Sequence, residues 1–271
     1  AATPGSGDGA LLRVSGDATA QIVRRGVDAS AVPALTIGAG AKVSGTSVTL
    51  DSTHATTLNP SAIIGGQAIA LDSGQITLQL ASAGSVPASS GLTLSGAALQ
   101  GLQSAQSLSL LSYSSIDIYG TGAIGTLDAG GLPTLANLAL HAGEIRGFNS
   151  AGGAVSFAAR DILIDNSAAA ASPGATAATG GSLTFNAGTL RLGANQLALD
   201  QFGGVTFNAT GGILGQGTGG ISVQGNLTLN TPLVTGATAS TQALTATGVL
   251  TLNAPLGSTA TATPGLGAIL S

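Results

Sequence analysis

The tetrad Leu183-Thr184-Phe185-Asn186 carries the pattern that decides the fold: apolar, variable, apolar, then polar. It recurs along most of the chain, and successive fourth positions are 21 to 24 residues apart. The other nine copies are Val48–Asp51, Ile69–Asp72, Leu92–Ser95, Ile116–Tyr119, Leu138–His141, Ile162–Asp165, Val205–Asn208, Leu227–Asn230 and Leu250–Asn253. Side chains alternate across a strand, so both apolar positions share one face. A self-similar period in the twenties is typical of a solenoid, in which stacked repeats bury a common core.

Each period holds further short alternating segments, such as Ile76–Leu78 and Leu197–Leu199, and Gly, Asn, Asp or Ser separates them. Several short strands per period favour a coil that turns corners. A helix would need apolar residues three and four positions apart over ten or more positions, and no run free of glycine has that spacing. We therefore predict an all-β fold, a right-handed parallel β-helix with 21 to 24 residues per coil.

The chain is predicted to form one elongated domain. Residues 1–34 read as an irregular start or as first coils, because glycines keep their strand-like segments short. Residues 35–271 are expected to form the β-helix. Three segments rich in Ala, Ser, Thr or Gly are predicted to leave it as loops, near 81–91, 166–180 and 231–248.

Charge is sparse and composition is not that of a disordered chain. Lys and Arg number 7 and Asp and Glu 11, for a net charge of −4, while 44% of residues are hydrophobic. That apolar content, arranged in alternating pairs, argues against intrinsic disorder. Scattered basic residues argue against a nucleic-acid partner, which requires clustered Lys and Arg. The absence of methionine indicates a processed protein or a piece of a longer one, with any signal peptide outside it.

The polar fourth position of the tetrad predicts a structural ladder along one corner. Stacked asparagines bond from one coil to the next, as amide ladders do in cross-β stacks. The predicted members are Asp165, Asn186, Asn208, Asn230 and Asn253. A second predicted column consists of threonines: Thr184, Thr206, Thr228 and Thr251. Threonine is β-branched and suits a pleated surface. The alternative interpretation is a regular array of hydroxyl groups of the kind that ice-binding solenoids have.

Candidate catalytic chemistry is limited to one carboxylate pair. The coil places Asp51 and Asp72 about 5 Å apart, a separation that retaining glycosidases use. A turn-forming pair at a corner is the simpler interpretation, so we predict no enzyme activity, no catalytic residue and no cofactor. His141, Glu144 and Arg146 lie near one another in sequence and supply too few ligands for a metal site. Arg160, Asp161 and Asp165 read as a solvated charge cluster.

The stretch Gly180–Gly188, a Gly-Gly pair followed by a tetrad ending in Asn, resembles the repeats of filamentous haemagglutinin-type large exoproteins of Gram-negative bacteria. Gly9–Ser15 also resembles a stretch from the shafts of that family. The secretion domain of that family carries Asn-Pro-Asn motifs, whereas here Ser61 follows Asn59-Pro60, so the likeness is to the shaft and transfers no functional residue.

The resemblance implies a non-enzymatic shaft segment of a secreted protein at the outer cell surface, acting in adhesion or as the stalk of a toxin. Its implied partners are an outer-membrane secretion pore for the parent protein and a receptor or glycan on a host or neighbouring cell. Two alternatives remain. In the first, the chain is a polysaccharide-degrading enzyme that uses Asp51 and Asp72. In the second, it is a self-associating fibre subunit whose sheet edges pair.

Overall fold

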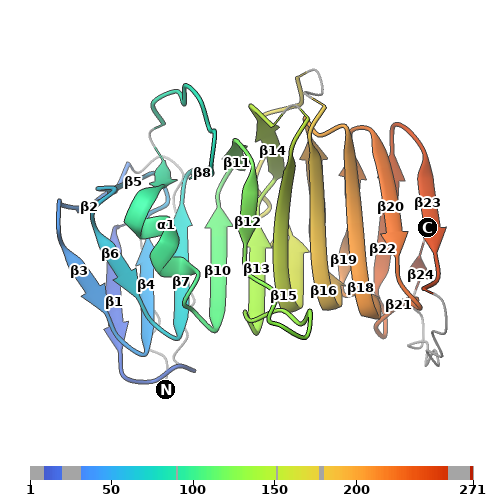
Figure 1. The fold of residues 1–271 in the computed structure, drawn as a ribbon, viewed down its shortest axis with the longest axis horizontal. Helices are drawn as coiled ribbons and strands as arrows, with labels where there is room; N and C mark the ends of the chain where they lie inside the picture. Colours follow the sequence, from blue (N-terminus) through green and yellow to red (C-terminus); the bar gives the residue numbers. More distant parts are fainter. Residues whose placement is uncertain are drawn as a thin grey trace.

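The protein is a stack of strands that follow one another along its length. The computed structural model describes residues 9–19, 32–89, 91–150, 152–176, 180–255 and 269–270. Within these ranges it consists of 24 strands and one short helix, α1 (Gly96–Leu102). The strands stand side by side, and their order follows the sequence from one end of the molecule to the other (Figure 1). The predicted all-β class is confirmed, with long parallel sheets.

The larger sheet has 12 strands and runs the length of the stack. Its main path, in spatial order, is β1 (Leu11–Ser15), β4 (Ser47–Asp51), β7 (Ala68–Ser73), β10 (Ser107–Ser112), β13 (Asn137–His141), β15 (Ala154–Asp165), β16 (Ser182–Leu192), β18 (Gly204–Gly215), β20 (Asn226–Asn230) and β23 (Leu250–Asn253). Two short strands also belong to it, β12 (Gly122–Ile124) beside β15 and β21 (Val234–Gly236) beside β18. Among the strands described, β1 and β4 form the one antiparallel pair between named strands.

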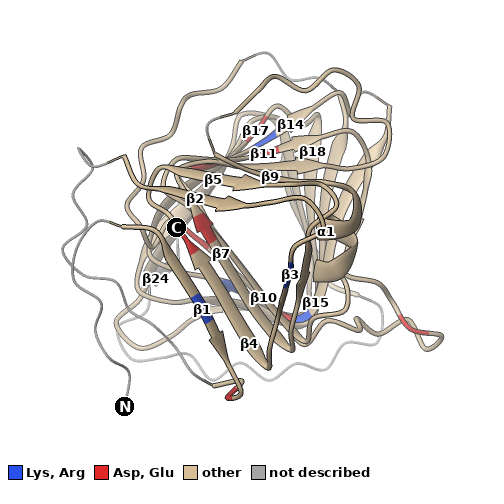
Figure 2. Cartoon of the chain, turned by 90° about the vertical axis from the view of Figure 1, so that its left-hand side faces the viewer, with Lys and Arg blue, Asp and Glu red and all other residues tan. Residues whose placement is uncertain are grey.

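A second sheet of eight strands forms another wall of the stack. In spatial order it contains β9 (Leu92–Leu94), β8 (Ile76–Gln79), β11 (Ser115–Tyr119), β14 (Glu144–Phe148), β17 (Asn195–Asp200), β19 (Thr218–Val223), β22 (Thr241–Ala246) and β24 (Ile269–Leu270). Near the N-terminal end, β2 (Ala34–Ile37) pairs with β5 (Ala55–Leu58), and β3 (Lys42–Ser44) with β6 (Ile63–Gly65). Viewed from that end, the strands enclose a common interior (Figure 2).

The interior is filled by columns of like side chains. Parallel register places Leu50 beside Leu71, Leu71 beside Leu110 and Leu110 beside Leu140, and all four are fully buried. Farther along, a phenylalanine column includes Phe157, Phe185 and Phe207, whose successive ring centroids are 5.4 Å apart. Each fully buried side chain of this size stabilises the fold by roughly 1.5–3 kcal/mol. The alternation seen in the sequence therefore produces one continuous apolar core.

The ten tetrads do not form one column, and that part of the prediction is wrong. The Leu92 and Ile116 copies lie in the eight-stranded sheet. In the larger sheet, Leu108 rather than Leu92 follows Ile69. An apolar-variable-apolar segment fits a strand on any wall of the stack, since every wall buries alternate side chains. The pattern identifies strands without assigning them to a sheet.

The predicted loops correspond only in part to the structure. Residues 81–91 and 166–180 contain no named strand where described, as expected. The segment 231–248 instead contains β21 and β22, which pair with β18 and β19. One short helix interrupts the strands: α1 buries Ala98, Leu99 and Leu102 beside β6. Two strand-like segments are expected within residues 1–34. The first, Leu12–Val14, lies in β1, and the second, Gln21–Val23, lies outside the described residues.

A first prediction concerns the phenylalanine column. Phe185→Ala should lower the free energy of unfolding by about 3–5 kcal/mol, because it leaves a cavity between Phe157 and Phe207. Urea denaturation measures the loss. Thr184→Ala, one position along and on the opposite face, is the matched control and should cost less than about 1 kcal/mol. Equal losses in the two variants would contradict the assignment of Phe185 to the core.

Candidate functional site

Four asparagines form a hydrogen-bonded ladder on the larger sheet. Register places Asn186 beside Asn208, Asn208 beside Asn230 and Asn230 beside Asn253. Parallel strands are about 4.8 Å apart, a distance that a pair of side-chain amides spans. The Nδ2 atoms of Asn208, Asn230 and Asn253 donate to the Oδ1 atoms of Asn186, Asn208 and Asn230 over 2.9, 2.8 and 3.0 Å. The four predicted asparagines are therefore brought together, and the Thr184, Thr206, Thr228 and Thr251 column lies in the same register.

Asp165 does not belong to the ladder, and its inclusion in the prediction is wrong. The register partner of Asn186 on the N-terminal side is Ala158. Both Ala158 and Asp165 belong to the long strand β15, which spans two sections of the stack. Its second section pairs with Leu190–Leu192 of β16 rather than with the Leu183 tetrad. Asp165 and Asn186 are therefore 21 residues apart and both end a tetrad, but the two residues are not register partners in the sheet.

The ladder has a direction, and its N-terminal end is open. Every bond runs from an Nδ2 atom to the Oδ1 atom of the preceding asparagine. Asn186 accepts from Asn208, but its own Nδ2 group has no hydrogen-bond partner among the described residues. The side chain of Ala158 is a methyl group and cannot accept this bond. One amide donor is therefore unpaired at a fixed position on the surface.

A small hairpin overhangs this open end. The chain between β12 and β13 closes through bonds from Thr134 N to Thr126 O, 2.9 Å, and from Asp128 N to Leu132 O, 2.8 Å. The Asp128 carboxylate also accepts from the backbone of Gly130 and Leu132. Leu127 and Leu132 remain 52% and 63% exposed. The sequence analysis did not single out this hairpin, although its Asp-Ala-Gly-Gly turn residues are a recognisable signal.

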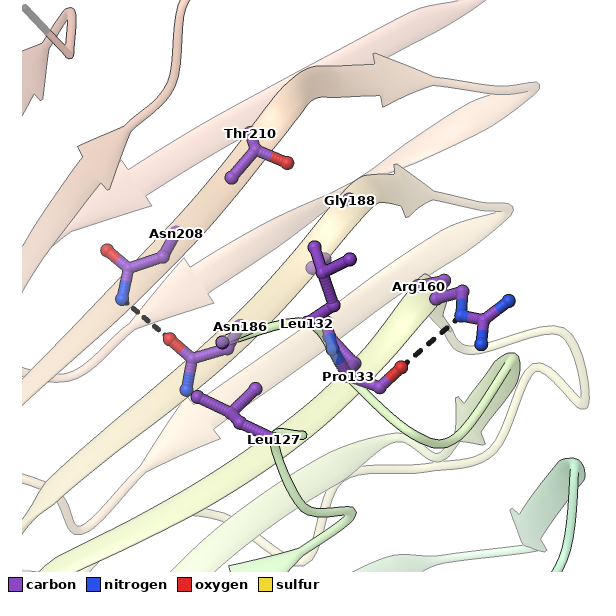
Figure 3. A pocket seen from close by; sticks show the side chains of 10 residues that line it. Leu127, Leu132, Pro133, Arg160, Asn186, Gly188, Asn208 and Thr210 are labelled. Atoms are coloured by element: carbon purple, nitrogen blue, oxygen red, sulfur yellow. Dashed lines mark hydrogen bonds between the residues drawn. The ribbon is translucent and has the colours of Figure 1, made fainter. Parts of the chain in front are cut away.

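The hairpin and the ladder together enclose a cavity of about 190 Å³. Leu127, Leu132 and Pro133 line it from the hairpin, and Asn186 and Asn208 line it from the sheet (Figure 3). The remaining lining residues are Gly131, Arg160, Ala187, Gly188 and Thr210. Arg160 is its only charged member, and the Arg160 Nε donates to the Pro133 carbonyl over 3.3 Å. This arrangement presents apolar side chains opposite planar amides.

Asp51 and Asp72 lie side by side in the register of β4 and β7, as the sequence predicts. They do not face one cavity together. Asp72 lines a cavity of about 330 Å³ on the larger sheet together with His141, whereas Asp51 is outside its lining and only 3% exposed. A retaining glycosidase needs both carboxylates at the same scissile bond. This geometry does not favour that chemistry.

His141 contacts Asp165 and Ser167, a combination that superficially matches a hydrolytic triad. Both contacts involve the same ring nitrogen: Nδ1 lies 2.5 Å from Asp165 Oδ1 and 3.0 Å from Ser167 Oγ. A triad requires the acid on one imidazole nitrogen and the nucleophile on the other. The group therefore ties the loop after β15 to β13 and is not arranged for nucleophilic catalysis.

The predicted charge cluster of Arg160, Asp161 and Asp165 is dispersed over three partners. Asp161 pairs with Arg191 at 2.8 Å, Arg160 bonds to Pro133 and Asp165 bonds to His141. These residues occupy one strand, whose side chains alternate between faces and walls. The cluster prediction is wrong because nearness in sequence does not bring alternate side chains together.

A charge network that the sequence analysis missed lies on the eight-stranded sheet. Arg146 is in register between Asp117 and Asp200. Its guanidinium donates two bonds to the Asp117 carboxylate, at 2.9 and 2.8 Å. Gln75 and Ser115 each donate a further bond to Asp117, both at 2.8 Å. The register could not be read from the sequence, because the described residues between β15 and β16 add no strand to this sheet and β14 therefore pairs directly with β17.

Glu144 and Asp200 form a carboxyl pair beside this network. Burial, followed by the hydrogen bond and the charge of Glu144, raises the pKa of Asp200 to about 6. Glu144 is completely buried, and its Oε2 accepts from Ser172 Oγ at 2.8 Å and from Gly174 N at 2.9 Å. The pair thus fastens the loop after β15 against β14, next to a cavity of about 490 Å³ lined by Ser172 and Ala198 among others.

Comparison with known proteins adds no relative. The sequence matches no protein-family model, and neither a curated protein nor a solved structure shows significant similarity to it. In the part of the chain that the structure describes, no helix has the length and apolar character needed to span a membrane. No three His, Asp or Glu side chains gather there as a metal site either.

The ladder generates a second prediction. Asn208→Ala removes two amide bonds, one to each neighbour, and should lower the free energy of unfolding by about 1–3 kcal/mol. Asn253→Ala removes one bond at the exposed end and should cost less. Chemical denaturation of both variants measures the difference. A loss in Asn253→Ala equal to or above that in Asn208→Ala would contradict the ladder.

The carboxyl pair generates a third prediction. Because the pKa of Asp200 is raised to about 6, the folded chain keeps a proton there that the unfolded chain loses near pH 4. This contribution to stability is therefore complete below about pH 4 and is lost as the pH rises through about 6. Asp200→Asn, which keeps a donor for Glu144 and does not titrate, should weaken the pH dependence. Thermal unfolding across this range measures it, with Asp161→Asn as the control that should behave like the unmodified chain.

Proposed function

We propose that the chain is a shaft segment, a right-handed parallel β-helix, which acts by rigid extension and by repeated surface contacts. The observation that carries this proposal is the unbroken series of parallel strand pairs from β4 to β23. Backbone hydrogen bonds then run along the length of the molecule, so bending it requires that they be strained together. The right hand follows from the strong preference of parallel crossover connections.

The surface supports attachment by many weak contacts. Only 18 of 271 residues are charged, and none lies after Asp200. Outward positions in the C-terminal half are threonines and asparagines repeated in register, as in the Thr206 and Asn208 columns. Such columns present the same hydroxyl or amide at each step. One contact of this kind binds weakly, and affinity comes from engaging several at once.

The proposed setting is the outer surface of a Gram-negative bacterium, where the segment acts in adhesion or presents a distal effector. Its proposed partners are a receptor or glycan on a host or neighbouring cell and, for the parent protein, an outer-membrane secretion pore. Support for this setting is the sequence resemblance of Gly180–Gly188 to shaft repeats, together with the parallel stack.

A second candidate function is that of a self-associating fibre subunit. β23 is the last strand on the larger sheet among those described, and Leu250 and Leu252 are 45% and 59% exposed on it. An exposed strand edge with apolar side chains invites pairing with another chain.

A fourth prediction tests attachment. The chain displayed in many copies on a bead should bind a surface of epithelial cells or bacteria with an apparent affinity about 10²- to 10⁴-fold above that of the free chain. Bead retention against competing free chain measures the ratio. Beads carrying an unrelated protein at equal density are the control.

Equal affinities of the bead and the free chain, or binding by neither, would contradict multivalent attachment. Sedimentation of the same preparation separates the two candidate functions. A shaft segment keeps its monomer mass at all concentrations, whereas a fibre subunit grows in mass as concentration rises.

A further inference from the structure

The open end of the asparagine ladder lacks one acceptor. Along the ladder, each Nδ2 group meets the side-chain carbonyl of another amide, at 2.8 to 3.0 Å. At Asn186 the next register position is Ala158, so the donor has no such partner among the described residues. The group that would continue the ladder is a planar amide carbonyl. Figure 3 shows the Asn186 nitrogen directed away from Asn208 and toward the side of Leu127.

The hairpin places a rigid apolar surface beside that donor. Two backbone hydrogen bonds close it, from Thr134 N to Thr126 O and from Asp128 N to Leu132 O, and the Asp128 carboxylate accepts a further bond from Leu132 N. Gly125 enters the hairpin at φ +78, with Ala158 O only 2.0 Å from where a Cβ would lie. The conformation is therefore fixed by packing. Leu127 and Leu132 nevertheless stay exposed, and both line the cavity, so the hairpin offers an apolar surface to whatever occupies it.

The dimensions and polarity of the cavity limit the ligand. A volume of 190 Å³ corresponds to about six waters at roughly 30 Å³ each, room for one ring with its substituents and too little for an extended peptide. Thr210 supplies a hydroxyl and Asn186 an amide donor at its wall, and Arg160 is the only charge. A ligand that complements this lining carries an amide carbonyl, a methyl group and uncharged hydroxyls, and an N-acetylated amino sugar combines all three.

We propose that this cavity binds the acetamido group of an N-acetylated amino sugar. The acetamido carbonyl accepts the bond from Asn186 Nδ2 and so continues the ladder, while its methyl packs against Leu127 and Leu132. The ring hydroxyls face Thr210 and Arg160. This inference deepens the proposed attachment function, on which it rests, by naming the chemistry of a ligand.

The test compares two sugars that differ at this group. Chitotriose, with an acetamido group on every ring, and cellotriose, with a hydroxyl there, are titrated into the monomeric chain. Calorimetry and saturation-transfer NMR follow the binding. Chitotriose should bind at least about tenfold more tightly, since cellotriose leaves the donor unpaired and the leucines uncovered. Its acetyl methyl protons should show the strongest saturation.

Two variants locate the contact. Asn186→Asp keeps an oxygen that accepts from Asn208 and replaces the unpaired donor with a carboxylate oxygen that cannot donate, so the ladder survives while chitotriose binding weakens about three- to tenfold. Leu132→Ser should weaken it comparably. Leu252→Ser, at 59% exposure against 63% for Leu132, is the matched control and should bind like the unmodified chain. Unchanged thermal unfolding of all three shows that each is folded.

Equal affinity for the two sugars, no binding at millimolar chitotriose, or full affinity in both pocket variants would overturn the proposal. These results are separable from those of the attachment experiment. Beads that adhere although the free chain ignores chitotriose would reject the cavity and leave the shaft function standing. Chitotriose binding without bead adhesion would support the sugar site in the cavity and contradict multivalent attachment.

Discussion

Parallel, in-register pairing is the interaction on which the rest of the structure depends. The backbone of each strand is about 4.8 Å from the next, and register then places like beside like. Leucine meets leucine inside, as with Leu50, Leu71 and Leu110, and asparagine meets asparagine outside. A slip of one residue would turn every apolar side chain outward. The same pairing therefore fixes the core, the ladder and the position of every surface column.

This constraint also explains why the chain carries so few charges. A charged column in parallel register would place like charges one strand apart, where they repel. The structure tolerates charge mainly where opposite signs alternate, as in Asp117, Arg146 and Asp200 along the eight-stranded sheet. Two carboxyls also meet at Glu144 and Asp200, where burial and the neighbouring Glu144 raise the pKa of Asp200 to about 6. Neutral polar residues avoid the difficulty altogether.

The sequence predicts the strands well and their assignment to sheets poorly. Alternation is a local property, so Ile76–Leu78 and Leu197–Leu199 could be recognised as strands. Which strands become neighbours depends on where one turn of the chain contributes no strand to a sheet. Inserted segments determine those positions. The segment between β8 and β9 leaves the Leu92 copy in the smaller sheet beside β8, and the loop after β15 brings Arg146 beside Asp200.

The candidate site shows the same division. Four asparagines at nearly equal steps predict the ladder, because each of those steps is one uninterrupted passage of the chain. Asp165 precedes a loop, and the next tetrad, Leu183–Asn186, pairs with the first section of β15 rather than with the section that ends at Asp165. The same spacing therefore gives the wrong neighbour there. The position of the hairpin over Asn186 was not predicted, because its own sequence indicates a turn but does not indicate which strand it lies against.

Specific chemistry arises where the stack is interrupted. A uniform stack presents the same group at every step, and its neighbours pair with each other, as Asn208 does with both adjacent asparagines. An unpaired polar group needs a break in the series. The hairpin at residues 126–134 covers such a break at Asn186, and the loop held by Glu144 covers another part of the wall. The repeated strands supply rigidity, and the interruptions supply the few positions at which a polar group differs from its neighbours along the column.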